Sequence, residues 1–399
     1  MKKTAVTFLL AALLLCTILP ASVPAAAVED TGITINVYNW GEYISTGDDD
    51  LMDVNEEFYN RTGIRVNYTT FDTNESLYTK LKSGGVSYDV IIPSDYMISK
   101  MIAEGMLLEL NYDNIPNYSL IDDRFKTDCE YDPANKYSVP YTWGEVGILY
   151  NTKYVTEPVD SWEILWNEQY RDKILMFDNQ RDAFGIAQKL LGYSFNSDNE
   201  AEWTAAAEKL KEQHKVNPHY VMDQIFDKMS SEDAWIAPYY SGDFLTIHDL
   251  NENVQLALPK EGTNLFVDAM CIPTCAANKE AAEAYINFMC ETDVATDNIS
   301  FISYSSPQME AAENHKAYLA EEYGDWAVEA IYPDDLSNCE TFQSLSEETN
   351  KRMDDLWVEV KSAGNSSSMA ILLVVGVLVV IVAVLIIFRI RKKRMDAEI

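Results

Sequence analysis

Segments with a strand pattern and segments with a helix pattern alternate three times between residues 33 and 107. Residues 33–40 alternate apolar and polar side chains, as a half-buried strand does, whereas Val54 and Phe58 recur at the spacing of one helical face. The alternation predicts strands at 33–40, 64–71 and 88–93 and helices at 49–63, 74–85 and 97–107. This β-α-β-α-β-α order predicts an α/β domain with a mainly parallel sheet.

Cap and turn residues predict where these elements begin and end. We expect the first helix to carry Leu51 on its apolar face and to end at Gly63. Asn74 is the expected cap of the second helix, because its side chain can accept a hydrogen bond from a free amide of the first turn. Residues 94–96 are the expected loop before the third helix.

The pattern restarts after an extended segment at 137–151, which we expect to cross into a second α/β unit. The elements predicted beyond it are strands at 173–178, 234–242 and 267–273 and helices at 182–194, 200–213, 279–290 and 347–362. We expect two lobes: lobe 1 comprises 28–142 and 267–338, and lobe 2 comprises 143–266 and 339–361. Ligands of such sheets bind beyond the carboxyl ends of the strands, which predicts a site in the cleft between the lobes.

The two ends of the chain differ in composition from the rest. Two lysines, an apolar run and small residues at 25–27 are typical of a secretory signal peptide, which we place at 1–27. Residues 369–388 carry no charge over a length that spans a bilayer, and five basic residues follow. We therefore expect an exported protein with an extracytoplasmic binding domain, a linker at 362–368, one transmembrane anchor at 369–388 and a cytoplasmic tail at 389–399.

Acidic residues outnumber basic ones by 64 to 30, which gives a formal net charge of −34. Such a surface repels nucleic acid and attracts cations, although solubility alone also explains it. Cys271 and Cys275 give only a weak zinc signal, and buried thiols are the preferred interpretation. No nucleophile elbow, phosphate-binding loop or HExxH motif is present. We therefore expect no catalytic residue, no metal and no cofactor, and predict that the chain is not an enzyme.

Rings and carboxylates gather where the predicted strands end. The side chains at these positions are Trp40, Tyr43, Ser94, Tyr96, Asp178, Asn179, Asp182, Tyr239, Tyr240, Phe266 and Asp268. Carboxylates form charge-assisted hydrogen bonds with an ammonium group, and ring faces attract cations while they cover methylene groups. A linear polyamine alternates ammonium and methylene groups, so it fits this set of side chains. Each ring taken alone is also explained by core packing.

Seven stretches of the chain carry a family resemblance. In chain order they are YNWGEYI, NESLYTKLKSGGVSYDVIIPSDY, YSVPYTWG, SWEILW, DNQRDAFGIAQKLLGYS, YSGD and VDAMCIP. In order and spacing, over most of 33–361, they resemble the spermidine/putrescine-binding proteins of ABC transporters. The resemblance implies a periplasmic-binding-protein fold of the class II type, in which two lobes close over the ligand at a hinge.

The resemblance also implies which residues bind the ligand. Matched position by position, they are Trp40, Tyr43, Ser94, Tyr96, Asn179, Asp182, Tyr239, Phe266, Asp268, Tyr304 and Gln343. Asp268 matches the carboxylate that holds an ammonium group, and we expect it to contribute most. Asn179 stands where the family commonly has Asp, and Asp182 stands where Glu is usual. One charge fewer and one shorter side chain favour a shorter diamine, or shift the register of a triamine.

The function implied by the resemblance is solute capture. The protein would bind polyamines, putrescine or spermidine or both, as a monomer and deliver them to an ABC permease and ATPase encoded elsewhere. Two alternatives keep the fold: a membrane-anchored polyamine sensor, and a binding protein for another small cationic solute. A third alternative, an enzyme that uses cleft carboxylates for acid–base work, is disfavoured by the missing motifs.

Overall fold

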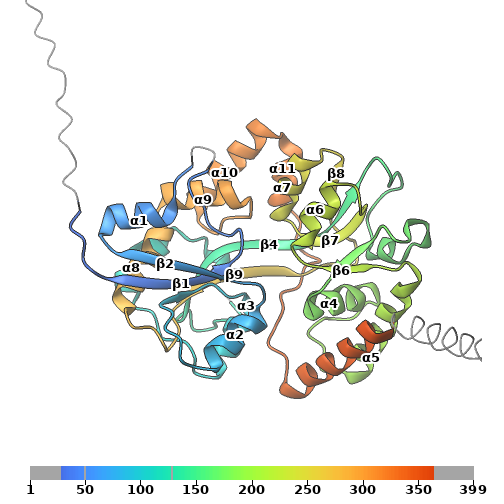
Figure 1. Cartoon of the computed structure of the whole chain (residues 1–399), viewed down its shortest axis with the longest axis horizontal. Coiled ribbons are helices and arrows are strands. Elements are labelled where there is room, and N and C mark those ends of the chain that lie inside the picture. Colours follow the sequence, from blue (N-terminus) through green and yellow to red (C-terminus); the bar gives the residue numbers. More distant parts are fainter. Residues whose placement is uncertain (1–27, 49–50, 127–128, 364–399) are drawn as a thin grey trace, which may run out of the picture.

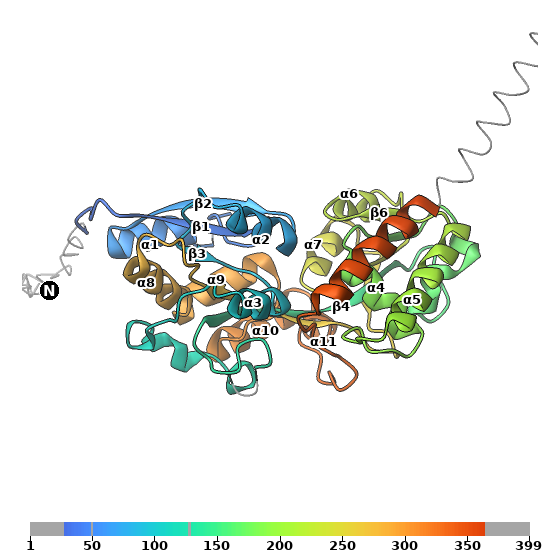
Figure 2. The same cartoon turned by 90° about the horizontal axis from the view of Figure 1, so that it is seen from below.

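The computed structural model describes residues 28–48, 51–126 and 129–363. Two α/β bodies lie side by side, and two long strands run from one body into the other (Figure 1). Turned by 90°, the molecule shows the two bodies meeting near its middle (Figure 2). We keep the names lobe 1 and lobe 2 for these bodies, with the residue ranges given above.

The predicted signal peptide, membrane anchor and cytoplasmic tail lie outside the described residues. The same holds for residues 364–368, which form most of the predicted linker. Among the helices of the described residues, none combines the length and the apolar character needed to cross a bilayer.

Lobe 1 begins with the three predicted strand–helix pairs. They are β1 (Thr34–Trp40), α1 (Val54–Thr62), β2 (Arg65–Phe71), α2 (Asn74–Lys82), β3 (Val90–Ile91) and α3 (Asp95–Ala103). β1 lies between β2 and β3 and pairs with both in the parallel sense, as the β-α-β-α-β order predicts. The carboxyl ends of these strands therefore meet at one edge of the sheet.

The first helix is shorter than predicted. Asp53 caps α1 by accepting a hydrogen bond from the amide of Glu56 at 3.0 Å, so Leu51 lies before the helix and not on its face. The predicted end at Gly63 is confirmed. Gly63 has a φ of 70°, and a Cβ there would lie 2.2 Å from the carbonyl oxygen of Glu29, which explains why glycine is needed.

The predicted cap of α2 and the predicted loop before α3 are both wrong. Thr73 caps α2, since its hydroxyl accepts the amide of Ser76 at 3.1 Å. Asn74 instead holds the residue that precedes α3. Its Oδ1 accepts the amide of Ser94 at 3.1 Å, and its Nδ2 donates to the Ser94 hydroxyl at 3.0 Å. Ser94 is the N-cap of α3, so Asp95 is already helical, and the loop between β3 and α3 is residues 92–94 instead of 94–96.

The predicted crossing segment is a long strand shared by both lobes. β4 (Ser138–Asn151) pairs antiparallel with β9 (Leu265–Cys271) over its first part and with β7 (Ile236–Tyr240) and β8 (Val254–Ala257) over its second part. The partner changes between Glu145 and Val146. β9 also pairs antiparallel with β3 and thereby completes the sheet of lobe 1. The predicted lobe boundaries after residues 142 and 266 lie near this change.

A third segment crosses beside these strands. The amide of Glu340 donates to the carbonyl of Thr263 at 3.0 Å, and the carbonyl of Glu340 accepts from the amide of Leu265 at 3.0 Å. The two lobes are therefore joined by β4, by the chain leading into β9 and by the segment around Glu340. Three neighbouring crossings restrict relative motion of the lobes to a hinge.

Lobe 2 contains the second α/β unit. Its elements besides β7 and β8 are β5 (Leu175–Phe177), α4 (Gln180–Leu190), α5 (Glu200–Glu212), β6 (His219–Val221), α6 (Gln224–Ser230) and α7 (Asp243–Leu250). β5 and β6 pair in the parallel sense. Strand and helix predictions for β5, β7, α4 and α5 are confirmed with small shifts at the ends, whereas β6, β8, α6 and α7 were not predicted.

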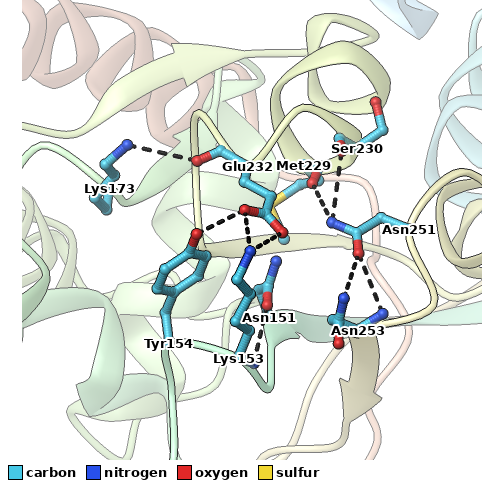
Figure 3. A network of polar contacts seen from close by, with 9 residues as sticks. All are labelled: Asn151, Lys153, Tyr154, Lys173, Met229, Ser230, Glu232, Asn251 and Asn253. Atoms are coloured by element: carbon cyan, nitrogen blue, oxygen red, sulfur yellow. Dashed lines mark hydrogen bonds and ion pairs between the residues drawn. The ribbon is translucent and has the colours of Figure 1, made fainter.

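A polar network holds the far end of lobe 2 together (Figure 3). The Glu232 carboxylate accepts hydrogen bonds from Lys153 Nζ at 2.8 Å and from Tyr154 Oη at 2.6 Å. Asn251 Nδ2 donates to the carbonyl of Met229 at 3.3 Å. These contacts tie the turn between α6 and β7 to the end of β4 and to the end of α7, so lobe 2 is braced away from the hinge.

The remaining helices follow β9. They are α8 (Lys279–Met289), α9 (Thr292–Ile302), α10 (Met309–Glu322), α11 (Asp325–Ile331) and a last helix at 347–363. Short 3-10 turns stand at Tyr112–Asn114, Pro116–Leu120, Asp123–Phe125, Trp162–Trp166, Glu168–Tyr170 and Gln213–Lys215. α8 and the last helix agree with the predictions, whereas α9, α10 and α11 were not predicted. Trp326 of α11 lies 4.8 Å from His248 of α7, which joins the lobes again outside the crossings.

Candidate ligand-binding site

A cleft of about 280 Å³ lies where the two lobes meet. It is lined by residues at the carboxyl ends of β1, β2, β5, β6 and β7, at the starts of α3 and α4, and by residues of β9. One basic side chain, Arg181, is among the lining residues. The acidic ones number seven: Glu42, Asp72, Asp95, Asp182, Asp223, Asp243 and Asp268. The strand-edge location expected from an α/β sheet is therefore where the cleft lies.

Asp268 lies within β9, with its side chain buried in the cleft wall. Tyr43 Oη donates a hydrogen bond to Asp268 Oδ2 at 2.8 Å and lies 2.6 Å from Thr142 Oγ1. The other carboxylate oxygen, Oδ1, is buried and has no hydrogen-bond partner among the described residues. Burial raises the pKa of Asp268 to about 6, although hydrogen bonds from Ser94 and Tyr43 lower it. Asp268 thus offers a free acceptor in a poorly hydrated place.

Two further carboxylates of the cleft, buried Asp182 and half-buried Asp243, repeat this arrangement. Tyr240 Oη donates to Asp182 Oδ2 at 2.9 Å, and Tyr304 Oη donates to Asp243 Oδ2 at 2.8 Å. Burial raises the pKa of each carboxyl group to about 7. Gly242 lets the Tyr304 ring approach, because a Cβ there would lie 2.1 Å from it. The cleft therefore contains three pairs of a carboxylate and a tyrosine hydroxyl.

The rings of these tyrosines pack together around Phe266. The ring centroid of Tyr304 lies 4.9 Å from that of Tyr43, at an interplanar angle of 87°, and 6.1 Å from that of Phe266. Tyr240 lies 5.5 Å from Phe266 at 80°. Trp40, the last residue of β1, adds a half-buried ring to the wall, and its indole N–H has no hydrogen-bond partner within the described residues. Edge-to-face packing keeps these rings in place without a ligand.

Asp95 is a buried carboxylate, and both of its oxygens accept hydrogen bonds from the backbone. Its Oδ1 accepts the amide of Tyr96 at 2.6 Å, and its Oδ2 accepts the amide of Val267 at 3.3 Å. Burial raises the pKa of Asp95 to about 8, and the charge of Asp268 adds to the rise. We interpret Asp95 as a residue that ties α3 to β9 and so positions Asp268.

Arg181 introduces a positive charge at the start of α4. Its Nη2 donates to Asn196 Oδ1 at 3.0 Å and to the carbonyl of Gln343 at 3.1 Å, whereas Nε and Nη1 are buried without hydrogen-bond partners among the described residues. The guanidinium lies 4.6 Å from the ring centroid of Phe342. Burial lowers the pKa of Arg181 to about 10, so the group is charged at neutral pH. Its positive charge disfavours the binding of a second cation beside Asp182.

The structure brings most of the predicted site residues together. Ten of them line the cleft: Trp40, Tyr43, Ser94, Tyr96, Asn179, Asp182, Tyr239, Phe266, Asp268 and Tyr304. Gln343 does not line it. Its Nε2 donates to the Glu130 carboxylate on an exposed surface, and the neighbouring Phe342 takes the position in the cleft wall.

Two residues of the predicted set are partly committed to the fold. Asn179 caps α4, because its Oδ1 accepts the amide of Arg181 at 3.0 Å. Its remaining polar atom is an amide nitrogen, which cannot accept a hydrogen bond from an ammonium group. Tyr239 is 3% exposed and stacks on Phe177 at 5.6 Å, whereas the next residue, Tyr240, reaches Asp182.

Sequence reasoning missed several acids of the cleft. They are Glu42 after β1, Asp72 after β2, Asp223 after β6 and Asp243 after β7, together with Asp95 at the start of α3. The position shortly after a strand is the signal that would have found most of them. β6 is three residues long, and so short a strand shows almost no alternation of apolar and polar residues from which it could be predicted.

Cysteines and histidines form no centre of their own. Cys271, Cys275, Cys290 and Cys339 are free thiols. Within the ranges that the structure describes, no group of three or more His, Cys, Asp or Glu side chains is arranged to hold a metal ion. The chemistry of the cleft is therefore that of carboxylates and rings.

The match to a protein family agrees with this cleft. The model of the bacterial extracellular solute-binding protein family matches residues 87–326. The chain belongs to this family. Because members of the family bind solutes, the prediction that this solute-binding protein is not an enzyme is confirmed, as is its two-lobed α/β fold.

Individual relatives of this solute-binding protein point the same way. The spermidine/putrescine-binding periplasmic protein of Escherichia coli K12 is 32% identical over 312 residues, which cover 78% of this chain and 86% of that protein. A structure described as a spermidine/putrescine ABC transporter from Listeria monocytogenes has a TM-score of 0.75 and 35% identity, covering 82% of this chain and 98% of the other. The spermidine/putrescine ABC transporter substrate-binding protein of Streptococcus pneumoniae has a TM-score of 0.71 and 34% identity, with coverages of 83% and 99%.

Proposed function

We propose that this solute-binding protein captures linear polyamines, with a diamine such as putrescine preferred, and delivers them to an ABC permease and ATPase encoded elsewhere. One observation carries the proposal. Asp182 and Asp268, which are buried, and Asp243, which is half-buried, each accept a tyrosine hydroxyl in a cleft walled by rings. The relatives whose names include spermidine and putrescine support the same ligand class.

The charge of the cleft selects for a cation with more than one charge. Seven acidic side chains face one arginine, and burial raises the pKa values of three of the acids to between about 6 and 7. An ammonium group would restore the ionised form of a buried carboxyl through a charge-assisted hydrogen bond. A cation with a single charge compensates one carboxylate only, and a solute that carries its own carboxylate is repelled. A polyamine places a further charge at each end of an apolar spacer.

The part of the cleft wall that the start of α4 forms favours a short ligand. Asn179 carries no charge and its oxygen already caps α4, so Asp182 is the charged ammonium acceptor at this end of the cleft. Arg181 stands beside it with two unpaired guanidinium nitrogens among the described residues. A third ammonium group directed toward Arg181 would meet repulsion where the family commonly has a second carboxylate. A diamine that spans Asp268 and one of the carboxylates of lobe 2 avoids this cost.

The proposed ligand contacts come from both lobes. They are Trp40, Tyr43, Ser94, Tyr96, Asn179, Asp182, Tyr239, Phe266, Asp268 and Tyr304, to which the cleft adds Tyr240 and Asp243. Gln343 would join them only if the segment after Glu340 moved inward. Closure of the lobes would exclude water and strengthen every contact between carboxylate and ammonium.

The proposal includes a location. Residues 1–27 would direct export and be removed, and residues 369–388 would anchor the protein in the cell membrane with both lobes outside. A single spanning helix cannot form a channel, so transport would need separate permease subunits. We propose that the binding unit is a monomer whose lobes divide near residues 142, 266 and 338.

Titration calorimetry of the detergent-solubilised full chain tests the ligand class. We expect saturable binding of putrescine and cadaverine, weaker binding of spermidine and spermine, and no heat with glutamate or betaine. Absence of heat with all four polyamines would exclude the proposed function. Tighter binding of betaine than of putrescine would point instead to a site for a singly charged cation.

A further inference from the structure

The last helix, residues 347–363, packs on lobe 2 along its length (Figure 2). Its apolar face is buried, with Met353, Leu356 and Val360 between 0% and 4% exposed. Trp357 of the same helix lies 6.1 Å from the ring of Phe184 in α4 and 5.5 Å from that of Tyr220 in β6. The helix is therefore part of the folded body of lobe 2.

Polar contacts hold this helix at both ends. Arg352 forms an ion pair with Glu200 of α5 at 3.2 Å near its start. Nearer to its end, Glu359 pairs with Lys211 at 2.9 Å, and the carbonyl of Val360 lies 3.0 Å from a ring nitrogen of His214. Within the described residues, the hydrogen bonds and ion pairs identified between residues 351–361 and other elements all reach lobe 2.

The end of the helix also supports the ligand wall. Lys361 Nζ donates to Asp178 Oδ1 at 2.6 Å, and Gln180 Nε2 donates to Asp354 Oδ1 at 2.6 Å. Asp178 and Gln180 flank Asn179 at the start of α4, the helix that presents Asp182 to the cleft. A displacement of the last helix would therefore disturb the lobe 2 side of the site.

The distance from this helix to the predicted anchor is short. Five residues, 364–368, separate Ala363 from the start of the apolar segment at 369, and a chain of that length reaches at most about 18 Å. Rotation of lobe 2 away from its own last helix would break the buried and charged contacts described above. Lobe 2 and its last helix therefore stay together, within this distance of the predicted anchor.

Lobe 1 is not held in this way. It joins lobe 2 through β4, the chain leading into β9 and the segment around Glu340. Side-chain contacts with α7 add to these crossings: the ring of Trp326 packs on that of His248, and Tyr304 and Tyr323 donate hydrogen bonds to Asp243 and Asp249. We propose that the membrane tether is mounted on lobe 2, so that lobe 2 is stationary at the membrane and lobe 1 is the half that moves when ligand binds. This inference rests on the proposed membrane anchoring and ligand binding.

The arrangement assigns different roles to the two lobes toward a membrane partner. Lobe 2 would present the same surface to a permease in the free and the bound state. Lobe 1 would change its distance from the membrane with ligand and so report whether the cleft is occupied. A membrane partner that binds only the ligand-bound protein would then recognise the position of lobe 1.

Förster resonance energy transfer from a donor dye on each lobe to an acceptor-labelled lipid tests the proposal. The full chain is placed in lipid nanodiscs that contain an acceptor-labelled lipid, with Cys275 and Cys339 replaced by serine. A donor dye is attached to one exposed position, either Lys80→Cys on α2 of lobe 1 or Glu208→Cys on α5 of lobe 2. Without ligand, we expect more efficient transfer from position 208 than from position 80. Saturating putrescine should change transfer from position 80 and leave position 208 within error.

The outcomes separate this inference from the proposed function. A ligand response at position 208 alone, or equal responses at both positions, would overturn the inference, and so would no response at either position when calorimetry of the same sample shows binding. Absence of any binding heat would overturn the proposed function, while the ligand-free comparison would still test which lobe is tethered. In a control variant, 20 Gly and Ser residues are inserted after Ala363, which lengthens the tether without changing the fold. Transfer from position 208 should fall in this variant and become sensitive to ligand.

Discussion

Replacement of Asp268 by asparagine isolates the charge of one carboxylate in an otherwise unchanged wall. The side chain is 4% exposed, and its Oδ2 accepts the Tyr43 hydroxyl at 2.8 Å. An asparagine oxygen can accept the same hydrogen bond, so the packing of Tyr43 and the strand pairing of β9 are retained. What is lost is the negative charge and the free acceptor Oδ1. The substitution therefore acts on ligand binding and hardly on folding.

The expected loss follows from the value of a charged hydrogen bond. Hydrogen bonds to charged groups contribute about 1.5–3 kcal/mol, and each 1.4 kcal/mol changes an equilibrium constant tenfold. Asp268→Asn should therefore weaken putrescine binding by roughly 10-fold to 150-fold. The pKa of Asp268 is raised to about 6, so the comparison is made at pH 8, where the wild-type carboxyl is ionised. Calorimetry gives the affinity, and thermal unfolding without ligand checks that the variant is folded.

Asp72→Asn provides the matched control. Asp72 lines the same cleft but is exposed, so water screens its charge and we expect a loss of less than about threefold. A loss of less than threefold for Asp268→Asn, in a folded variant, would refute the assignment of Asp268 to the ligand. Equal losses for both variants would show that the overall charge of the cleft acts, and not a direct contact.

Three further predictions concern pH, selectivity and stability. Because a bound ammonium lowers the raised pKa values of Asp182 and Asp243, about 7 in the free protein, binding should release protons, and the affinity for putrescine should fall as the pH is lowered from 8 to 5.5. Calorimetry in buffers of different ionisation enthalpy measures the released protons, and affinity independent of pH would contradict the buried-carboxylate account. Asn179→Asp should raise spermidine affinity relative to putrescine, because it adds a carboxylate beside Arg181; an unchanged ratio would argue against control of ligand length by this wall. Leu356→Ala, at a position 2% exposed in the last helix, should lower the free energy of unfolding by about 2–5 kcal/mol, as measured with urea, whereas Val358→Ala on the exposed face should change it little.

The raised pKa values of the cleft carboxyl groups make the stability of the ligand-free protein depend on pH. A carboxyl group whose pKa is raised by folding favours the folded state less as it ionises, so stability is lost as the pH rises through the raised pKa. With pKa values raised from 3.8 to about 7 for Asp182 and Asp243, the ligand-free protein should lose stability progressively between about pH 4 and pH 7. A polyamine would offset this loss, so ligand stabilisation should be greatest at the higher pH.

The order of the first six elements of lobe 1, from β1 to α3, followed from the sequence because it depends on local periods. The strands β1 and β2 alternate apolar and polar residues, and α1 ends at Gly63, where the backbone requires a positive φ. The start of α2 did not follow, because Asn74 and Thr73 are both good caps and the choice depends on the contact of Asn74 with Ser94, 20 residues away. β6, with three residues, was too short to carry a visible period.

By itself, the sequence determined the alternation of strands and helices, and with it the edge of each sheet at which polar side chains collect. It also indicated a cationic solute, because the residue types at that edge are rings and carboxylates, and the family resemblance suggested a polyamine. Only the tertiary structure decided how these residues are used. The pairing of Tyr43 with Asp268, Tyr240 with Asp182 and Tyr304 with Asp243 joins residues far apart in the chain. The commitment of the Asn179 oxygen to a helix cap and the position of Gln343 outside the cleft depend on helix ends and crossings that no local pattern encodes. Local periods arise from neighbouring residues, whereas these contacts arise from the register of β4 and β9 and from how the lobes meet.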